Sequence, residues 1–286
     1  MSVSAALDFG PLDLQRSMVM HRMGMGDPTA LLEPARLEKA WRAPSGVVRI
    51  ALRRGEAPGA VTVEASGPGA EEALAAWLPH LPPADGHDTF ATDHPVVRRL
   101  HRALPGLRVV GVPWLLDVAC AAILQQRVTL REARQSWGRI VRAHGERGEA
   151  GLAFPAAARL AEVPGWELER LGVDPKRGRA LRALAREEAR RPFLRPGTPL
   201  ADLRVRLLAL DGIGPWTTGM VLGFGAGDPD AVLVGDLHAP SQIAWALAGE
   251  ARADDARMLE LLEPFRGQRF RVTRLVLGAG PAAPRM

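Results

Sequence analysis

The sequence has no tyrosine, one cysteine and two lysines, and these shortages exclude several kinds of site. Because Cys120 stands alone, the chain cannot form an internal disulfide or supply a four-cysteine metal or iron–sulfur site. No run of about 18 uncharged apolar residues occurs, so we expect no membrane-spanning segment. The first residues lack the basic and then apolar pattern of a signal peptide, and we therefore expect a soluble cytoplasmic protein.

The basic residues are almost all arginine. Lys39 and Lys176 are the only lysines among 37 basic residues, and the net charge is +5 with an isoelectric point of about 10.6. A basic balance suits a polyanionic partner. An excess of Arg, Ala, Gly and Pro also follows from a GC-rich genome. The charge by itself therefore favours nucleic acid only modestly.

The apolar pattern divides the 286 residues into two regions. Residues 1–90 contain two predicted strands, 47–52 and 60–64, and a predicted helix over 69–78, which together indicate a small α+β domain. Residues 79–93 lack apolar periodicity and predict a boundary. Residues 91–286 then have an all-helical pattern. The predicted helices are 94–104, 114–125, 130–144, 176–191, 200–210, 215–224, 240–247 and 253–262.

Residues 210–217 carry the most informative turn signal. A predicted helix ends at Leu210, and Gly212 and Gly214 then make a turn too tight for larger side chains. Pro215 suits the first position of a second helix, since its missing N–H would have no partner there. Such a turn leaves backbone N–H groups free at a helix N-terminus, where they can bind a DNA phosphate. An ordinary helix connection uses the same residue types, so the spacing alone leaves both interpretations open.

The hairpin and the segment after it resemble a known superfamily. Residues 210–217 have the pattern Leu-x-Gly-Ile-Gly-x-x-Thr, and a Gly-rich loop over 225–235 leads to Asp236. This combination resembles the helix-hairpin-helix/Gly-Pro-Asp DNA glycosylases. Residues 123–126 and 172–177 are also similar to the 3-methyladenine DNA glycosylase II branch. The resemblance implies an α+β N-terminal domain followed by a mainly α-helical DNA glycosylase fold that contains a helix-hairpin-helix motif, with the hairpin at 203–224 and the catalytic loop at 225–238.

The resemblance also implies the reaction. Bifunctional members carry a lysine nucleophile in the second hairpin helix, and the matching residue here is Trp216, so a monofunctional enzyme of base excision repair that leaves an abasic site is implied. Asp236 matches the family's catalytic carboxylate, which stabilises positive charge on the sugar and orients water. Asp236 could instead cap the following helix. Pro240 argues against this, because proline at the first helical position would put the cap nearer Ala239.

The expected substrate pocket is lined by Trp216, Met220, His238 and Trp114. An electron-rich ring can stack on a cationic alkylated base, and Trp216 is the candidate, with a core position as the alternative. Met220 stands where close relatives place an aromatic residue. His238 could orient Asp236, touch a phosphate or be structural. The chain also lacks the tryptophan expected around Arg274. The lesion therefore stays open between an alkylated base and another damaged base, and a protein that binds DNA without excision is the further alternative.

Residues 126–128 are expected on an exposed turn. Thr129 and Glu132 form a capping-box pattern, so a helix begins directly after this turn. The resemblance implies that Arg127 fills the space left by a flipped base, with Gln126 beside it; a solvated arginine is the alternative. The other predicted DNA contacts are Gly212, Gly214 and Thr217. The C-terminal basic cluster, which either contacts phosphates or forms a solvated helix face, consists of Arg266, Arg269, Arg271 and Arg274.

No cofactor is expected to be required. The resemblance implies a monovalent cation, sodium or potassium, bound in the hairpin by the backbone carbonyls of Leu208, Leu210 and Ile213. The expected partner is double-stranded DNA that contains damaged bases, bound by a monomer, with no membrane partner. The expected location is the cytoplasm, in association with the nucleoid.

Overall fold

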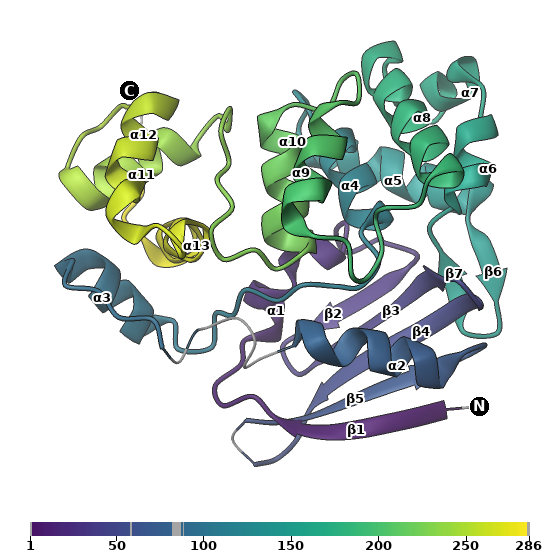
Figure 1. Cartoon of the computed structure of the whole chain (residues 1–286), viewed down its shortest axis with the longest axis horizontal. Helices are drawn as coiled ribbons and strands as arrows, with labels where there is room; N and C mark the ends of the chain where they lie inside the picture. The colour runs from purple at the N-terminus through teal and green to yellow at the C-terminus, as the bar shows by residue number, and fades with distance from the viewer. Residues whose placement is uncertain (1, 58, 82–86, 88, 285–286) are drawn as a thin grey trace.

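A five-stranded antiparallel sheet forms the N-terminal part of the computed structural model, which describes residues 2–57, 59–81, 87 and 89–284. Helix α2 (Ala70–Trp77) lies on this sheet (Figure 1). The predicted strands at 47–52 and 60–64 and the predicted helix at 69–78 are confirmed, whereas the sequence does not predict the other three strands. The strands are β1 (Ser2–Asp8), β2 (Ala30–Glu33), β3 (Arg36–Ala43), β4 (Gly46–Arg54) and β5 (Ala60–Ser66), in the order β1-β5-β4-β3-β2.

The centre of the sheet is buried on both faces. In β4 the consecutive residues Ile50, Ala51 and Leu52 are all buried, which a strand with one solvated face would not show. One apolar core therefore runs from the sheet into the helices that follow. Two short segments after β1 join this core, namely helix α1 (Leu14–Ser17) and the 3-10 turn η1 (Val19–His21).

The first helical group packs around α4 (Leu116–Leu124). Every residue of α4 from Asp117 to Leu124 is buried. This agrees with its sequence, since α4 carries apolar residues on all of its faces and a helix of that kind is stable only in the interior. The predicted capping box is present at the start of α5, where Thr129 Oγ1 accepts from the Glu132 amide and the Glu132 carboxylate accepts from the Thr129 amide. The other members are α5 (Leu130–His144), α6 (Ala157–Glu162), α7 (Gly165–Arg170), α8 (Pro175–Arg190), α9 (Leu200–Leu208), α10 (Pro215–Met220) and a π-helical turn η3 (Val221–Gly225).

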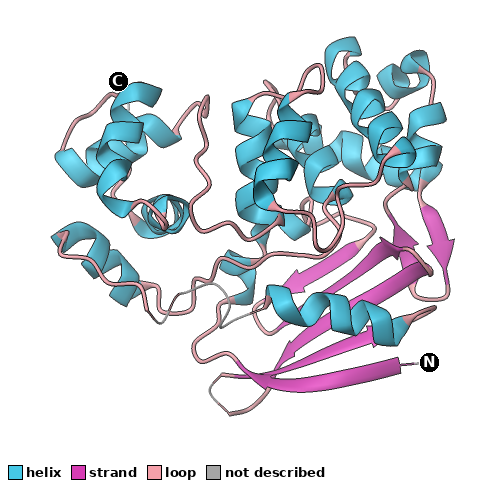
Figure 2. Ribbon diagram, in the orientation of Figure 1, coloured by secondary structure: helices cyan, strands magenta, loops and turns pink. Residues whose placement is uncertain are grey.

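A short β-hairpin interrupts the region predicted as wholly helical. Strands β6 (Glu146–Gly148) and β7 (Gly151–Ala153) pair with each other and contact β3 and β4 of the main sheet. Figure 2 shows the hairpin reaching from the helices toward the sheet. In the part of the chain that the structure describes, no helix has both the length and the apolar character needed to cross a bilayer.

A second helical group surrounds its own apolar core. It combines α3 (Pro95–Ala103) with α11 (Ala239–Ala248), α12 (Asp255–Leu262), the 3-10 turn η4 (Glu263–Phe265) and α13 (Arg269–Ala279). Figure 1 shows α3 beside the C-terminal helices, although it follows the sheet in sequence. Residues 82–86 and 88, within the predicted boundary at 79–93, lie outside the described residues. The 3-10 turn η2 (Leu78–His80) precedes them.

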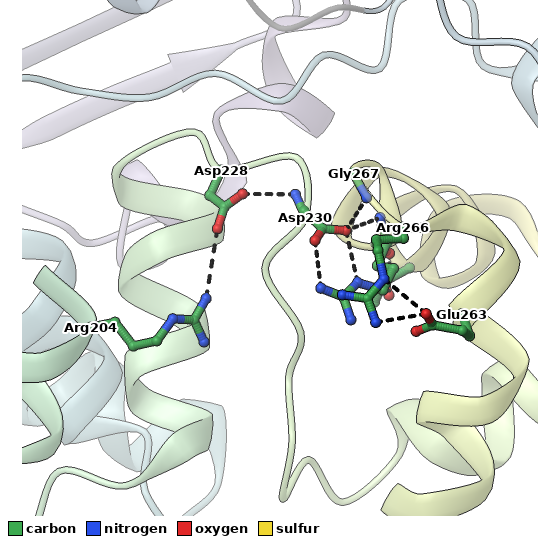
Figure 3. A network of polar contacts seen from close by, with 8 residues as sticks. Arg204, Asp228, Asp230, Glu263, Arg266 and Gly267 are labelled. Atoms are coloured by element: carbon green, nitrogen blue, oxygen red, sulfur yellow. Dashed lines mark hydrogen bonds and ion pairs between the residues drawn. The ribbon is translucent and has the colours of Figure 1, made fainter. Parts of the chain in front are cut away.

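The loop over residues 226–238 crosses from the first helical group to the second (Figures 1 and 3). Asp228 faces Arg204 of α9 at 4.0 Å, and Asp230 accepts from the Gly267 amide at 2.7 Å and pairs with Arg269 at the start of α13. Partial burial opposes ionisation of Asp230, but hydrogen bonds from Arg269 and from backbone amides outweigh it and lower the pKa of Asp230. Both helical groups therefore anchor the segment that leads to Asp236.

Candidate active site

A cleft of about 1380 Å³ opens where four segments meet. They are the turn between α4 and α5, the start of α8, the hairpin turn between α9 and α10, and the end of the crossing loop at residues 234–238. The cleft brings together most of the predicted site residues, namely Gln126, Arg127, Gly212, Gly214, Trp216, Thr217, Asp236 and His238. Lys176, at the start of α8, is exposed and also lines it.

The Asp236 carboxylate is fixed by three donors. Its Oδ2 accepts from Trp216 Nε1 at 2.8 Å, and its Oδ1 accepts from the amides of His238 and Ala239 at 2.8 and 2.9 Å. The inference that Pro240 disfavours capping by Asp236 is therefore wrong. Helix α11 begins at Ala239 with proline in its first turn, and the carboxylate reaches the free amides from outside the helix. Capping fixes one oxygen of the carboxylate, and Trp216 orients the other.

Asp255 holds the backbone just before Asp236, a contact that the sequence does not predict. Both carboxylate oxygens of Asp255, the first residue of α12, lie 3.0 Å from the Gly235 amide, which donates to them. Gly235 has φ +88°, a conformation that favours glycine. From the sequence, Asp255 is expected only to be an acidic residue in the first turn of a helix. Its distance from Gly235 along the chain gives no indication of a contact between the two. The loop is thus held by α10 on one side and by α12 on the other.

The predicted pocket residues separate into two sets. Trp216 is half-buried and His238 is exposed, and both line the cleft. Met220 is 5% exposed and belongs to the core, and Trp114 lies beside Trp41 with ring centroids 6.5 Å apart. Neither Met220 nor Trp114 lines the cleft, so their placement in the pocket is not supported. Leu237, which the sequence does not single out, is 85% exposed at the cleft.

The turn between α4 and α5 faces the hairpin. Arg127 is exposed with φ +54°, and it is the one non-glycine residue with positive φ in the described part of the chain. The Gln126 side-chain amide donates to the Gly212 carbonyl at 2.9 Å and to Thr217 Oγ1 at 2.8 Å. Thr217, predicted as a DNA contact, is 2% exposed, so its side chain is turned into the protein.

The two hairpin glycines have different surroundings. Gly212 has φ +79°, and a Cβ added there would lie 2.8 Å from the Ala180 Cβ. Gly214 has φ −101°, and a Cβ added there would meet no atom within 4 Å. Gly212 is therefore needed by the fold, while Gly214 leaves an open approach to the backbone. Of the predicted cation-binding carbonyls, that of Leu210 accepts from the Ile213 amide at 3.1 Å, and a carbonyl oxygen can accept a second contact.

The C-terminal basic cluster is not a solvated face. Arg271 and Arg274 are buried, and Arg274 lies over the Phe224 ring at 4.6 Å. Burial lowers the pKa of Arg274 to about 10. Arg269 pairs with Asp230, which leaves Arg266 as the exposed member, beside Glu263. The expectation that this cluster contacts phosphates or forms a solvated surface is therefore wrong for Arg271 and Arg274, because α13 packs with this side against the core.

Comparison with known proteins gives relatives in sequence and in structure, although no family model matches the chain. The probable bifunctional transcriptional activator/DNA repair enzyme AlkA of Mycobacterium tuberculosis is 34% identical over 150 residues, which are 50% of this chain and 29% of that protein. DNA-3-methyladenine glycosylase 2 of Escherichia coli is 34% identical over 124 residues, or 42% of this chain and 44% of that protein. The chain thus spans less than half the length of either relative.

The solved 3-methyladenine DNA glycosylase from Archaeoglobus fulgidus has the same fold over 96% of this chain and 97% of its own, with a TM-score of 0.77 at 17% identity. The chain therefore shares the fold of a solved 3-methyladenine DNA glycosylase over nearly its whole length, and it is similar in sequence to the relatives named above over about half of its length. The relatives matched in sequence and this solved structure carry the names of AlkA or of 3-methyladenine DNA glycosylases. The resemblance stated from the sequence is thereby confirmed.

Proposed function

We propose that this protein is a monofunctional DNA glycosylase that removes alkylated bases of the 3-methyladenine type from duplex DNA and leaves an abasic site. The observation that carries the proposal is the Asp236 carboxylate, fixed by Trp216 and two backbone amides in a cleft that also contains the hairpin turn and the exposed Arg127. The names of the relatives agree with this activity.

The fixed carboxylate suits the chemistry of N-glycosidic cleavage. Positive charge develops on the deoxyribose as the base leaves, and a preoriented negative group stabilises it without reorganisation. Three hydrogen bonds preset the orientation of Asp236 before DNA arrives. A cationic alkylated base leaves readily, so it needs little general-acid help. The indole of Trp216 is then available as a stacking wall for that cation.

The lysine content supports a monofunctional reaction. Lys39 is 3% exposed and pairs with Asp117 at 3.0 Å, so it cannot reach the cleft. Lys176 is the other lysine, and it approaches the cleft from α8 rather than from the hairpin helix that carries Trp216. A monofunctional enzyme forms no Schiff base with the sugar. Borohydride should therefore trap no covalent complex with DNA, and a trapped complex that disappears in the Lys176→Arg variant would contradict the proposal.

The proposed partner is damaged double-stranded DNA, bound as a monomer through its phosphates. Arg127, Lys176 and the open backbone at Gly214 all lie at the cleft and suit a polyanion. The proposal includes a monovalent cation on the carbonyls of Leu208, Leu210 and Ile213, which would brace the hairpin turn against the DNA backbone. Action on DNA would associate the protein with the nucleoid.

The deciding experiment measures base release from duplexes that carry 3-methyladenine, 7-methylguanine, a deaminated base or an oxidised base. We expect release of the alkylated purines, with the strand intact until alkali cleaves it. Asp236→Asn should slow release about 100-fold or more, while Asp202→Asn, at an exposed carboxylate of α9 away from the cleft, is the matched control. Release from none of the duplexes would favour a protein that binds DNA without excision, and release of another base alone would correct the substrate.

A further inference from the structure

The side chain of Gln126 connects two segments that are far apart in sequence. It lies on the turn between α4 and α5, and its Nε2 donates to the Gly212 carbonyl and to Thr217 Oγ1, at 2.9 and 2.8 Å. A primary amide has two N–H donors, and both are used here. Gln126 therefore has no amide donor left for a base edge or a phosphate, and its contacts suggest a function inside the protein.

The two acceptors of Gln126 belong to rigid parts of the hairpin. Gly212 is at the turn with φ +79° and packs closely on Ala180 of α8. Thr217 is buried in α10, directly after Trp216, whose indole donates to Asp236. Gln126 thus ties its own turn to the helix that also orients the carboxylate.

The residue after Gln126 needs such support. Arg127 is exposed at φ +54°, a left-handed conformation that residues with a Cβ rarely adopt. Strained backbone of this kind persists where neighbouring contacts determine it. The two hydrogen bonds of Gln126 fix the residue on one side of Arg127, and the capping box at Thr129 and Glu132 fixes the other.

We infer that Gln126 is a positioning residue that holds the turn bearing Arg127 against the hairpin. The hairpin backbone, which contacts the DNA, and Arg127, which displaces the base, then move as one rigid unit. The inference rests on the proposed function. It assigns to Gln126 an effect exerted through Arg127 rather than a contact with DNA of its own. Loss of the amide should leave the hairpin able to bind DNA while Arg127 loses its fixed direction.

The test compares Gln126→Met, which keeps the length of the side chain and removes both donors, with wild type. We expect single-turnover excision from a methylated duplex to slow about tenfold, the loss of one or two hydrogen bonds, with less than a twofold change in affinity for undamaged DNA. Gln135→Met, at an exposed glutamine of α5 that does not line the cleft, is the matched control. Thr217→Val should repeat part of the defect, and Thr217→Ser, which keeps the hydroxyl, should rescue it.

A double variant separates positioning from general damage. If Gln126 acts through Arg127, Gln126→Met combined with Arg127→Ala should be no slower than Arg127→Ala alone. Fluorescence of 2-aminopurine beside a tetrahydrofuran abasic analogue reports insertion of the turn without any excision, and it should fall in Gln126→Met. Additive rate losses, or unchanged fluorescence and rate, would overturn the inference. Wild type that perturbs the fluorescence but releases no base would instead refute the proposed function.

Discussion

Arg127 combines an exposed side chain with a backbone conformation that favours glycine. Because glycine takes positive φ without a steric penalty, Arg127→Gly should be more stable than Arg127→Ala by up to about 1 kcal/mol in the free energy of unfolding. Both variants remove the side chain that is proposed to fill the space of the flipped base, so both should lose excision rate to a similar degree. Urea unfolding and single-turnover assays on the same preparations measure the two effects separately.

The opposite order of stability would be informative. If Arg127→Ala unfolds at higher urea than Arg127→Gly, the turn does not keep a left-handed residue at position 127 in solution. The rigid geometry attributed to the Gln126 contacts would then lose its basis, while the chemistry proposed for Asp236 would be unaffected.

At the scale of single residues, the sequence predicts which residues belong to the site better than it predicts which hydrogen bonds they make. Asp236 and Trp216 follow from motif and spacing, but the hydrogen bond between them does not, because it depends on how the crossing loop is anchored at Asp230 and Asp255. The capping argument from Pro240 failed for a physical reason. A carboxylate outside the helix can still reach its first free amides, so proline in the first turn does not decide which residue caps it.

Among the elements, the hairpin turn allows effects on folding and effects on DNA binding to be measured at two different glycines. Gly212→Ala adds a Cβ at positive φ and 2.8 Å from Ala180, so it should lower the free energy of unfolding by about 1–2 kcal/mol or more. Gly214→Leu meets open space at an ordinary φ and should fold normally. If the backbone at Gly214 contacts a phosphate, this variant should weaken duplex binding at least several-fold and flatten the dependence of affinity on salt.

Thermal unfolding and binding titrations at several salt concentrations check both glycines, and Gly214→Ala serves as the small-side-chain control. Equal melting temperatures for Gly212→Ala and wild type would contradict the role of Gly212 in the turn. If Gly214→Leu binds DNA with the affinity of wild type, the hairpin backbone at this position does not contact the DNA.

The elements that the sequence predicts well are those with strong local signals. Helix α5 has its predicted bounds because a capping box marks its start. Strand β3 escapes prediction because Lys39 breaks the apolar pattern, although it is buried. The Asp117 carboxylate on α4, 3.0 Å away, and the faces of the Trp41 and Trp137 rings make a lysine tolerable at that position. Whether a charged residue can be buried in a strand thus depends on partners from distant segments, and these cannot be identified from a single sequence.

At the scale of the whole molecule, His21 lies where three distant parts of the chain meet. It is buried in η1, with its ring 5.9 Å from that of Trp41 on β3. Burial, followed by the positive charges of Lys39 and of Arg274 on α13, lowers the pKa of His21 to about 3. A hydrogen bond with the Phe224 backbone opposes this shift. The folded protein therefore keeps His21 neutral at a pH at which the same histidine in the unfolded chain would bind a proton.

This burial makes the stability of the molecule depend on pH in a defined direction. In the unfolded chain a histidine binds a proton below pH of about 6.5, whereas folded His21 does not do so until the pH approaches 3. The folded state thus loses stability as the pH falls through this window. For a pKa difference of this size the loss between pH 7.5 and pH 5 is about 2 kcal/mol. His21→Gln carries no proton in either state and should lack this contribution.

Urea unfolding of both proteins at pH 7.5 and pH 5 tests the prediction, and His238→Gln, at an exposed position, controls for the replacement of a histidine side chain by glutamine. We expect the free energy of unfolding to drop by about 2 kcal/mol more in wild type than in His21→Gln. Equal drops would mean that His21 binds its proton in the folded state, and that the sheet, η1 and α13 do not close around it as tightly as the structure describes.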